Sequence, residues 1–115
     1  MSTDSILKRK SMDFAKRIVR LYQYLGEGRE YILSKQVLRS GTSIGANIAE
    51  AIYGSSRKDF IAKLQIAQKE ASETLYWLEL LNGTGYLSDS AYLSLSSDCH
   101  ELLAMLASSI KTASK

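Results

Sequence analysis

The chain has 115 residues, of which 45% are hydrophobic and 23% charged, with one cysteine, no proline and a formal net charge of +3. This composition predicts one globular domain over residues 1–115 and excludes a disordered chain, an internal disulfide and a structural zinc site. No apolar run approaches the roughly 20 residues that cross a bilayer, and early charges argue against a signal peptide, so we expect a cytoplasmic protein without a membrane contact.

Three short breaks that contain glycine divide the chain into four segments with helical periodicity. They lie at 26–28, 54–56 and 82–85. Each break is short enough to return the chain antiparallel to the preceding segment, and the absence of proline permits long helices. The predicted fold is therefore all-α, an antiparallel up-down-up-down four-helix bundle.

The first predicted helix runs from about residue 5 to residue 25 and is rich in cations. Its apolar positions recur at helical spacing, at Leu7, Phe14, Ile18, Leu21 and Leu25. Residues 1–39 carry a balance of +5, whereas the rest of the chain carries −2. The candidates for nucleic-acid binding are Lys8, Arg9, Lys10, Lys16, Arg17 and Arg20. The alternative is an ordinary basic helix face that keeps the protein soluble.

The second predicted helix, from about 29 to 53, combines an apolar row with a row of small residues. The residues expected to point inward are Ile32, Leu38, Ile44, Ile48 and Ile52. Gly41, Gly45 and Ala49 recur at every fourth position and so share one face. Each internal glycine costs about 1 kcal/mol relative to alanine. We expect close approach of a neighbouring helix to offset this cost.

A polar row lies next to the small residues on the same helix, and its members are Arg39, Ser43, Asn47 and Glu50. The third helix offers Glu70 and Glu73, with Trp77 one turn later. We expect Arg39 or Asn47 to meet one of these carboxylates, across the bundle or across a subunit boundary. The candidate packing or interface anchors are Arg39, Gly41, Ser43, Gly45, Asn47, Glu50, Glu70, Glu73 and Trp77.

Serine caps and regular apolar rows define the last two predicted helices. Ser56 precedes the third helix, with Asp59 in its first turn, and Ser88 precedes the fourth. The third row is Phe60, Leu64, Ala67, Ala71, Leu75 and Leu78, and the fourth is Tyr92, Leu95, Cys99, Leu102, Leu106 and Ile110.

Catalytic chemistry finds little support in the sequence. His100 has no glutamate three residues before it, as a di-metal carboxylate bundle would require. Cys99 belongs to an apolar row, and neighbouring helical residues such as Cys99 and His100 point in different directions. No glycine-rich stretch has the spacing of a phosphate-binding loop. We therefore expect no enzyme activity, no catalytic residue, no metal and no cofactor.

Three stretches together resemble a known family. These are LRSGTSIGANIAEA at 38–51, SRKDFIAKLQIAQKEASETLYWLELL at 56–81 and GTGYLS at 83–88. They resemble the four-helix bundle family typified by proteins encoded in intervening sequences of bacterial 23S ribosomal RNA genes, over about residues 12–110. One departure is Ala51, where the family commonly has glycine. The resemblance implies an antiparallel bundle that assembles into a ring of five copies, with no established enzymatic activity.

A more distant similarity is to the accessory proteins of diversity-generating retroelements, which are basic pentameric bundles that bind nucleic acid. It implies nucleic-acid binding and nothing more. Two functions therefore remain open. The first is a homo-oligomer that binds RNA or DNA without reading sequence, through the basic face of the first helix. The second is a structural or adaptor module whose partner is another protein.

Overall fold

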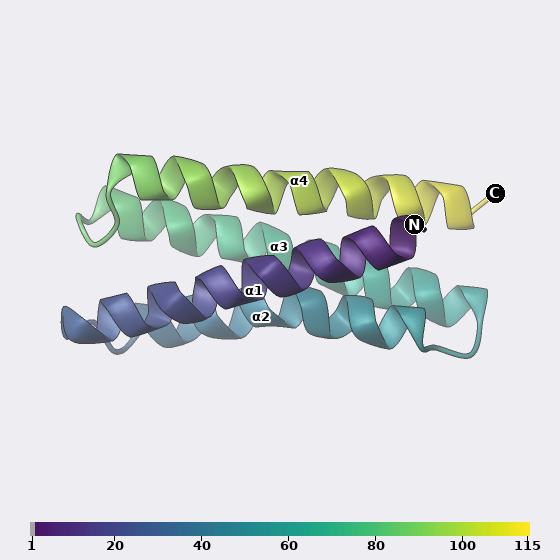
Figure 1. Cartoon of the computed structure of the whole chain (residues 1–115), viewed down its shortest axis with the longest axis horizontal. Coiled ribbons are helices and arrows are strands. Elements are labelled where there is room, and N and C mark those ends of the chain that lie inside the picture. The colour runs from purple at the N-terminus through teal and green to yellow at the C-terminus, as the bar shows by residue number, and fades with distance from the viewer. Residues whose placement is uncertain (1) are drawn as a thin grey trace.

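The computed structural model describes residues 2–115 as four helices and confirms the predicted four-helix bundle. The helices are α1 (Thr3–Glu27), α2 (Leu33–Ile52), α3 (Arg57–Gly83) and α4 (Asp89–Ala113). They run alternately up and down in a rod of 45 × 22 × 21 Å, with both chain ends and the α2–α3 loop at the same end (Figure 1). Helices that follow one another in sequence pack together, and α4 closes the bundle against α1.

A serine side chain caps the N-terminus of three of the helices. Ser2, Ser56 and Ser88 each accept a hydrogen bond from a backbone N–H three residues further on, at 3.0 to 3.2 Å. These bonds satisfy donors that have no partner inside the helix. The caps predicted at Ser56 and Ser88 are therefore confirmed.

The start of α2 corrects the prediction, because the helix begins at Leu33 rather than near residue 29. Arg29 has a positive φ of 63°, which turns the chain after α1. The Glu30 carboxylate then accepts hydrogen bonds from the N–H groups of Leu33 at 2.9 Å and Ser34 at 2.6 Å. Ile32, predicted to be buried, is 76% exposed, because it lies before the first helical turn.

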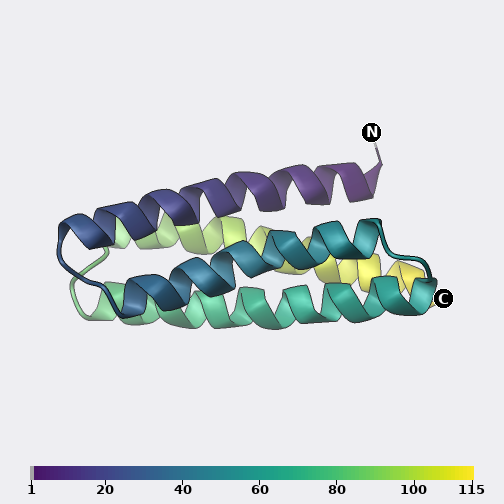
Figure 2. The ribbon, with the colours of Figure 1, turned by 90° about the horizontal axis from the view of Figure 1, so that it is seen from below.

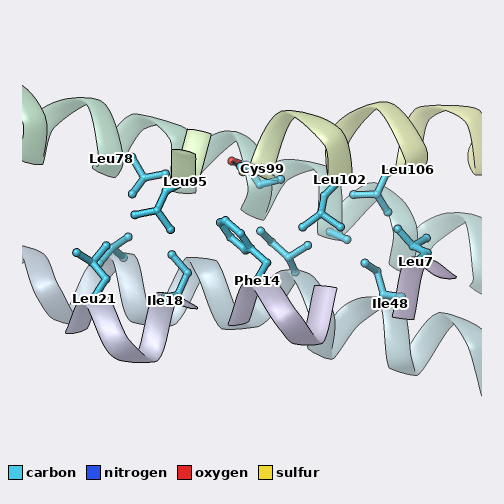
Figure 3. Packing of buried hydrophobic residues seen from close by; sticks show 14 of the residues in the cluster. Leu7, Phe14, Ile18, Leu21, Ile48, Leu78, Leu95, Cys99, Leu102 and Leu106 are labelled. Atoms are coloured by element: carbon cyan, nitrogen blue, oxygen red, sulfur yellow. Dashed lines mark hydrogen bonds between the residues drawn. The ribbon is translucent and has the colours of Figure 1, made fainter. Parts of the chain in front are cut away.

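The predicted apolar rows otherwise form the core, except that Phe60, Leu75, Tyr92 and Ile110 are only partly buried against it. Every apolar residue predicted for α1 is buried, and Phe14 points from α1 into the space between the helices (Figure 3). In α2, Ile44 and Ile48 are fully buried, whereas Leu38 and Ile52 are only partly buried. Val37 and Ala51 complete the buried face of this helix, and the prediction missed both.

Candidate functional site

The six cations proposed for α1 do not form one surface. Two of them are ion-paired with α4. Lys10 Nζ lies 2.7 Å from Glu101 Oε1, and Arg17 Nη1 lies 2.6 Å from Asp98 Oδ2. Arg17 also donates to the hydroxyl of Ser94, at 2.9 Å. The charges of Lys10 and Arg17 are thus largely offset within the chain.

Lys8 lies on the opposite flank of α1, against the end of α2. Its Nζ donates to the hydroxyl of Tyr53 at 2.6 Å and lies 4.7 Å from the centre of the ring. Tyr53 is 75% exposed, so this contact forms at the surface. The position of Lys8 is therefore set by an aromatic residue just after α2.

The other three cations face solvent along the side of α1 that points away from the core. We call Arg9, Lys16 and Arg20 the α1 cation stripe; all three are exposed. Their spacing of seven and then four residues keeps them on one helix face. Asp13 is exposed on the same face, so four charged side chains give a balance of +2. This stripe is the exposed part of the basic face predicted from the sequence.

Arg39 meets both candidate carboxylates of α3 within the same chain. Its Nη1 lies 3.2 Å from Glu70 Oε2, and its other terminal nitrogen bonds Glu73. The indole N–H of Trp77 donates to the same Glu73 oxygen at 3.0 Å. Half of the Arg39 side chain is exposed, so this cluster is a surface connection between α2 and α3.

The rest of the polar row does not reach these carboxylates. Ser43 Oγ donates to the carbonyl of Arg39 at 2.6 Å, and Asn47 Nδ2 donates to the carbonyl of Ser43 at 2.8 Å. Asn47 is therefore bonded to its own helix, and of the two predicted alternatives Arg39 is the residue that meets the carboxylates. Glu50 lies 3.6 Å from Lys63 Nζ on α3.

The two glycines of α2 face α1. A Cβ atom on Gly41 would lie 2.8 Å from both γ-carbons of Ile18, which is too close for any real contact. A Cβ atom on Gly45 would lie 3.4 Å from the backbone oxygen of Ser11. Figure 2 shows α1 and α2 running along each other beside this contact. The small residues therefore let α1 approach the α2 backbone.

Two grooves flank α1. The larger, of 440 Å³, is open and lies between α1 and α4; Arg17, Leu21 and Ala91 are among the residues that line it. The smaller, of 260 Å³, lies between α1 and α2 and is lined mainly by apolar and small residues, including Met12 and Ala46. Neither groove holds a cluster of catalytic groups.

The single thiol is not placed for chemistry. Burial raises the pKa of Cys99 to about 12, with a further contribution from Asp98. Its Sγ lies 3.3 Å from the carbonyl oxygen of Ala71 in the core. A thiol with this pKa is almost entirely protonated at neutral pH and is a poor nucleophile.

Residues 2–115 form neither a metal-binding cluster nor a helix that could span a membrane. In this part of the chain, no three side chains among His, Cys, Asp and Glu come together to hold a metal ion. None of the four described helices has the length and apolar character that crossing a bilayer requires.

The comparisons with known proteins agree with this architecture. The sequence profile of a family described as 23S rRNA-intervening sequence protein matches residues 3–108. A crystal structure of a protein with unknown function, from the S23 ribosomal protein family of Bacteroides thetaiotaomicron VPI-5482, has a TM-score of 0.94 and 54% sequence identity. The match covers 96% of this chain and 99% of that one. No curated protein matches the chain.

Proposed function

The chain belongs to the 23S rRNA-intervening sequence protein family, and from this premise we propose a function without catalysis. In this proposal the four-helix bundle assembles with copies of itself, as a ring of five, and binds nucleic acid without reading its sequence. The α1 cation stripe supplies the contacts to phosphate groups. The natural compartment in this proposal is the cytoplasm.

The observation that carries the proposal is the exposed stripe of Arg9, Lys16 and Arg20 on α1. Lysine and arginine that neutralise phosphates release bound counterions, and this release favours binding whatever the base sequence. A stripe of three cations next to one acid binds weakly on its own. A ring repeats the stripe in each copy, so weak contacts to one polyanion add up.

The family context supports a role beside RNA in general terms only. The relative from Bacteroides thetaiotaomicron VPI-5482 is assigned to a ribosomal protein family, although its own function is unknown. In the structure, Lys10 and Arg17 are ion-paired within the chain and are not available for this contact. The proposed contact therefore uses fewer cations than the sequence predicts.

The test is a titration of fluorescently labelled single-stranded RNA and DNA at low and at moderate salt. We expect binding at low salt that weakens steeply as salt rises. The variant Arg9→Gln/Lys16→Gln/Arg20→Gln should bind at least about tenfold more weakly, with a shallower salt dependence. The matched control is Arg29→Gln/Lys35→Gln/Lys69→Gln, which removes three exposed cations elsewhere and should change the affinity less than about threefold.

Two outcomes would overturn the proposal. If the wild-type protein binds neither RNA nor DNA at low salt, nucleic-acid binding is wrong and the adaptor function becomes the better explanation. If the stripe variant and the control variant lose the same affinity, net charge rather than the stripe determines binding. Self-association is tested separately by light scattering, with a mass five times that of the chain expected; the mass of a single chain would contradict it.

A further inference from the structure

A second group of cations lies where α3 begins and α4 ends. Arg57 and Lys58 are exposed in the first turn of α3, and Lys111 is exposed in the last turn of α4. Arg57 Nη1 donates to the carbonyl of Lys115 at 3.3 Å, so these segments touch although 58 residues separate them. An open groove of 620 Å³ between these segments is lined by Arg57 and Lys58, and not by Lys111. We call Arg57, Lys58 and Lys111 the α3–α4 cation cluster.

The fold concentrates positive charge at this end of the rod. The N-terminal part of α1, the α2–α3 loop and the C-terminal part of α4 all lie there (Figure 1). Residues 2–10, 50–63 and 101–115 contain eight lysines and arginines but four acids, a balance of +4. The rest of the chain has a balance of −1. The dipoles of antiparallel helices oppose one another, so side chains set the charge of this end.

The cluster is less neutralised than Lys10 and Arg17 of α1. Lys10 and Lys63, at the same end, are paired with Glu101 and Glu50. Among the side-chain carboxylates of residues 2–115, none forms an ion pair with Arg57, Lys58 or Lys111, and Arg57 bonds the main-chain oxygen of Lys115. The nearby Asp59 carboxylate lies against the backbone of Gly54, and it does not line the groove.

We propose that the α3–α4 cation cluster is a second anchoring point for the phosphate backbone of a nucleic acid. This inference rests on the proposed function and extends the contact beyond α1. The groove beside the cluster is lined by Ile61, Ala62 and Gln65 and contains no aromatic side chain. It can therefore hold a backbone by charge, but it offers no platform on which bases would stack.

The placement of the two cationic surfaces favours a long polyanion over a short acidic peptide. The stripe lies on the outer side of α1, whereas the cluster lies between α3 and α4. A strand of sufficient length can contact both surfaces of one molecule, and an acidic peptide of a few residues can occupy only one of them. Binding should therefore depend on the length of the oligonucleotide, with a strand of about 30 nucleotides preferred to one of about 6.

The test compares wild type with Arg57→Gln/Lys58→Gln/Lys111→Gln on single-stranded oligonucleotides of both lengths. For the long strand we expect at least about tenfold weaker binding and a slope of log K against log salt that is shallower by about two. For the short strand we expect a change of less than about threefold, because such a strand contacts one surface at a time. The control is again Arg29→Gln/Lys35→Gln/Lys69→Gln. Helix content and thermal midpoint should match wild type, since the three residues are exposed.

If Arg57 proves necessary for folding, a charge-reversal variant that leaves Arg57 unchanged tests the inference instead. Lys58→Glu/Lys111→Glu leaves the contact between Arg57 and Lys115 in place and should weaken binding of the long strand still further. An unlabelled polyglutamate of equal charge serves as the competitor, and it should displace the nucleic acid at least about tenfold less effectively than the same nucleic acid unlabelled.

The outcomes separate this inference from the proposed function. If wild type binds nucleic acid and both cluster variants bind equally well, the cluster is not a contact and the α1 stripe alone is sufficient. If polyglutamate competes as well as nucleic acid, the cluster recognises acidic polymers in general and the inference is wrong. If wild type binds no nucleic acid at all, the proposed function itself fails.

Discussion

α1 packs against its two neighbours in different ways. Against α2 it meets backbone and small side chains, with Ile18 over Gly41 and no room for an added carbon. Against α4 it is held at the rim by Lys10 and Arg17, while an open groove of 440 Å³ lies between the two helices. Both contacts share the apolar core, but the first depends on close approach of the α2 backbone, whereas the second has ion pairs at its rim.

The difference shows which neighbour fixes the position of α1. A close contact between helix backbones loses attraction as soon as the helices separate, since dispersion falls off steeply with distance. An ion pair between half-exposed side chains tolerates small displacements and is screened by salt. We therefore infer that α2 sets the position of α1 and that α4 adds a weaker, adjustable contact.

The largest effect is expected from filling the contact between α1 and α2. Gly41→Leu places carbon atoms where Ile18 already lies, and it should destabilise the protein by about 3 kcal/mol despite the better helix propensity of leucine. Urea unfolding followed by circular dichroism measures the change. A midpoint equal to that of wild type would show that α1 and α2 are not held together as described.

The control for this substitution is a glycine without close neighbours. Gly26 lies in α1, and a Cβ atom added there would meet nothing within 4 Å. Gly26→Ala should therefore be neutral or stabilising by up to about 1 kcal/mol. Adding Ile18→Ala to Gly41→Leu should recover part of the lost stability, because it removes the atoms that clash. Strict additivity of the two changes would argue against a direct contact.

A smaller effect is expected at the turn that leads from α1 into α2. Glu30 is buried, which opposes ionisation, yet hydrogen bonds from the N–H groups of Leu33, Ser34 and Ile32 give a net lowering of its pKa from the ordinary 4.5. Glu30→Gln removes this charged cap and should cost about 1 kcal/mol at pH 7. Thermal unfolding at neutral pH measures the loss.

The pH dependence of this difference has a defined direction. Because the folded-state pKa is below the unfolded value, the ionised carboxylate contributes stability that is fully present above about pH 4.5 and is lost as pH falls through the lower folded value. The gap in stability between wild type and Glu30→Gln should therefore narrow between about pH 5 and pH 3. A gap that stays constant over this range would mean that the charge of Glu30 does not cap α2.

The fold was predictable because its evidence is local. The recurrence of Phe14, Ile18 and Leu21, or of Cys99 and Leu102, indicates a buried helix face without knowledge of any partner. The error at the start of α2 arose because a glutamate acts as the cap there, whereas the usual signature is Ser, Thr, Asp or Asn. A helix that starts near residue 29 places Ile32 on the inward face, and the sequence pattern therefore predicts that Ile32 is buried.

The candidate surfaces were less predictable, because their properties depend on residues far away in the sequence. Lys10 and Arg17 lose most of their electrostatic effect to carboxylates 91 and 81 residues further along. Arg57 and Lys58 belong to the part of the chain whose overall charge is negative, and only the packing of α3 against α4 brings them to a groove shared with Ala113 and Ser114. Charge totals along a sequence cannot show such pairings.

The ion pairs between α1 and α4 should contribute little to stability. Arg17→Gln removes the contact with Asp98, in which both side chains are partly exposed, and should cost about 0.5 kcal/mol at low salt and less at high salt. The control is Lys16→Gln, which removes an exposed charge with no ion pair to any residue among 2–115. A loss above about 2 kcal/mol for Arg17→Gln would mean that charge anchors α1 to α4 more firmly than the exposed geometry suggests.

The smallest effect is expected from adding a leucine side chain to the contact between α1 and α4. Ala91→Leu places a leucine on the wall of the groove between α1 and α4, where the larger side chain finds space next to Leu21 and Leu95. Its burial should offset the cost of ordering the side chain, so stability should change by less than about 0.5 kcal/mol or rise slightly. Gly41→Leu and Ala91→Leu thus place the same leucine side chain in two surroundings. If both destabilised the protein equally, the two contacts of α1 would be equally tight, and the open groove would not represent free space in the folded protein.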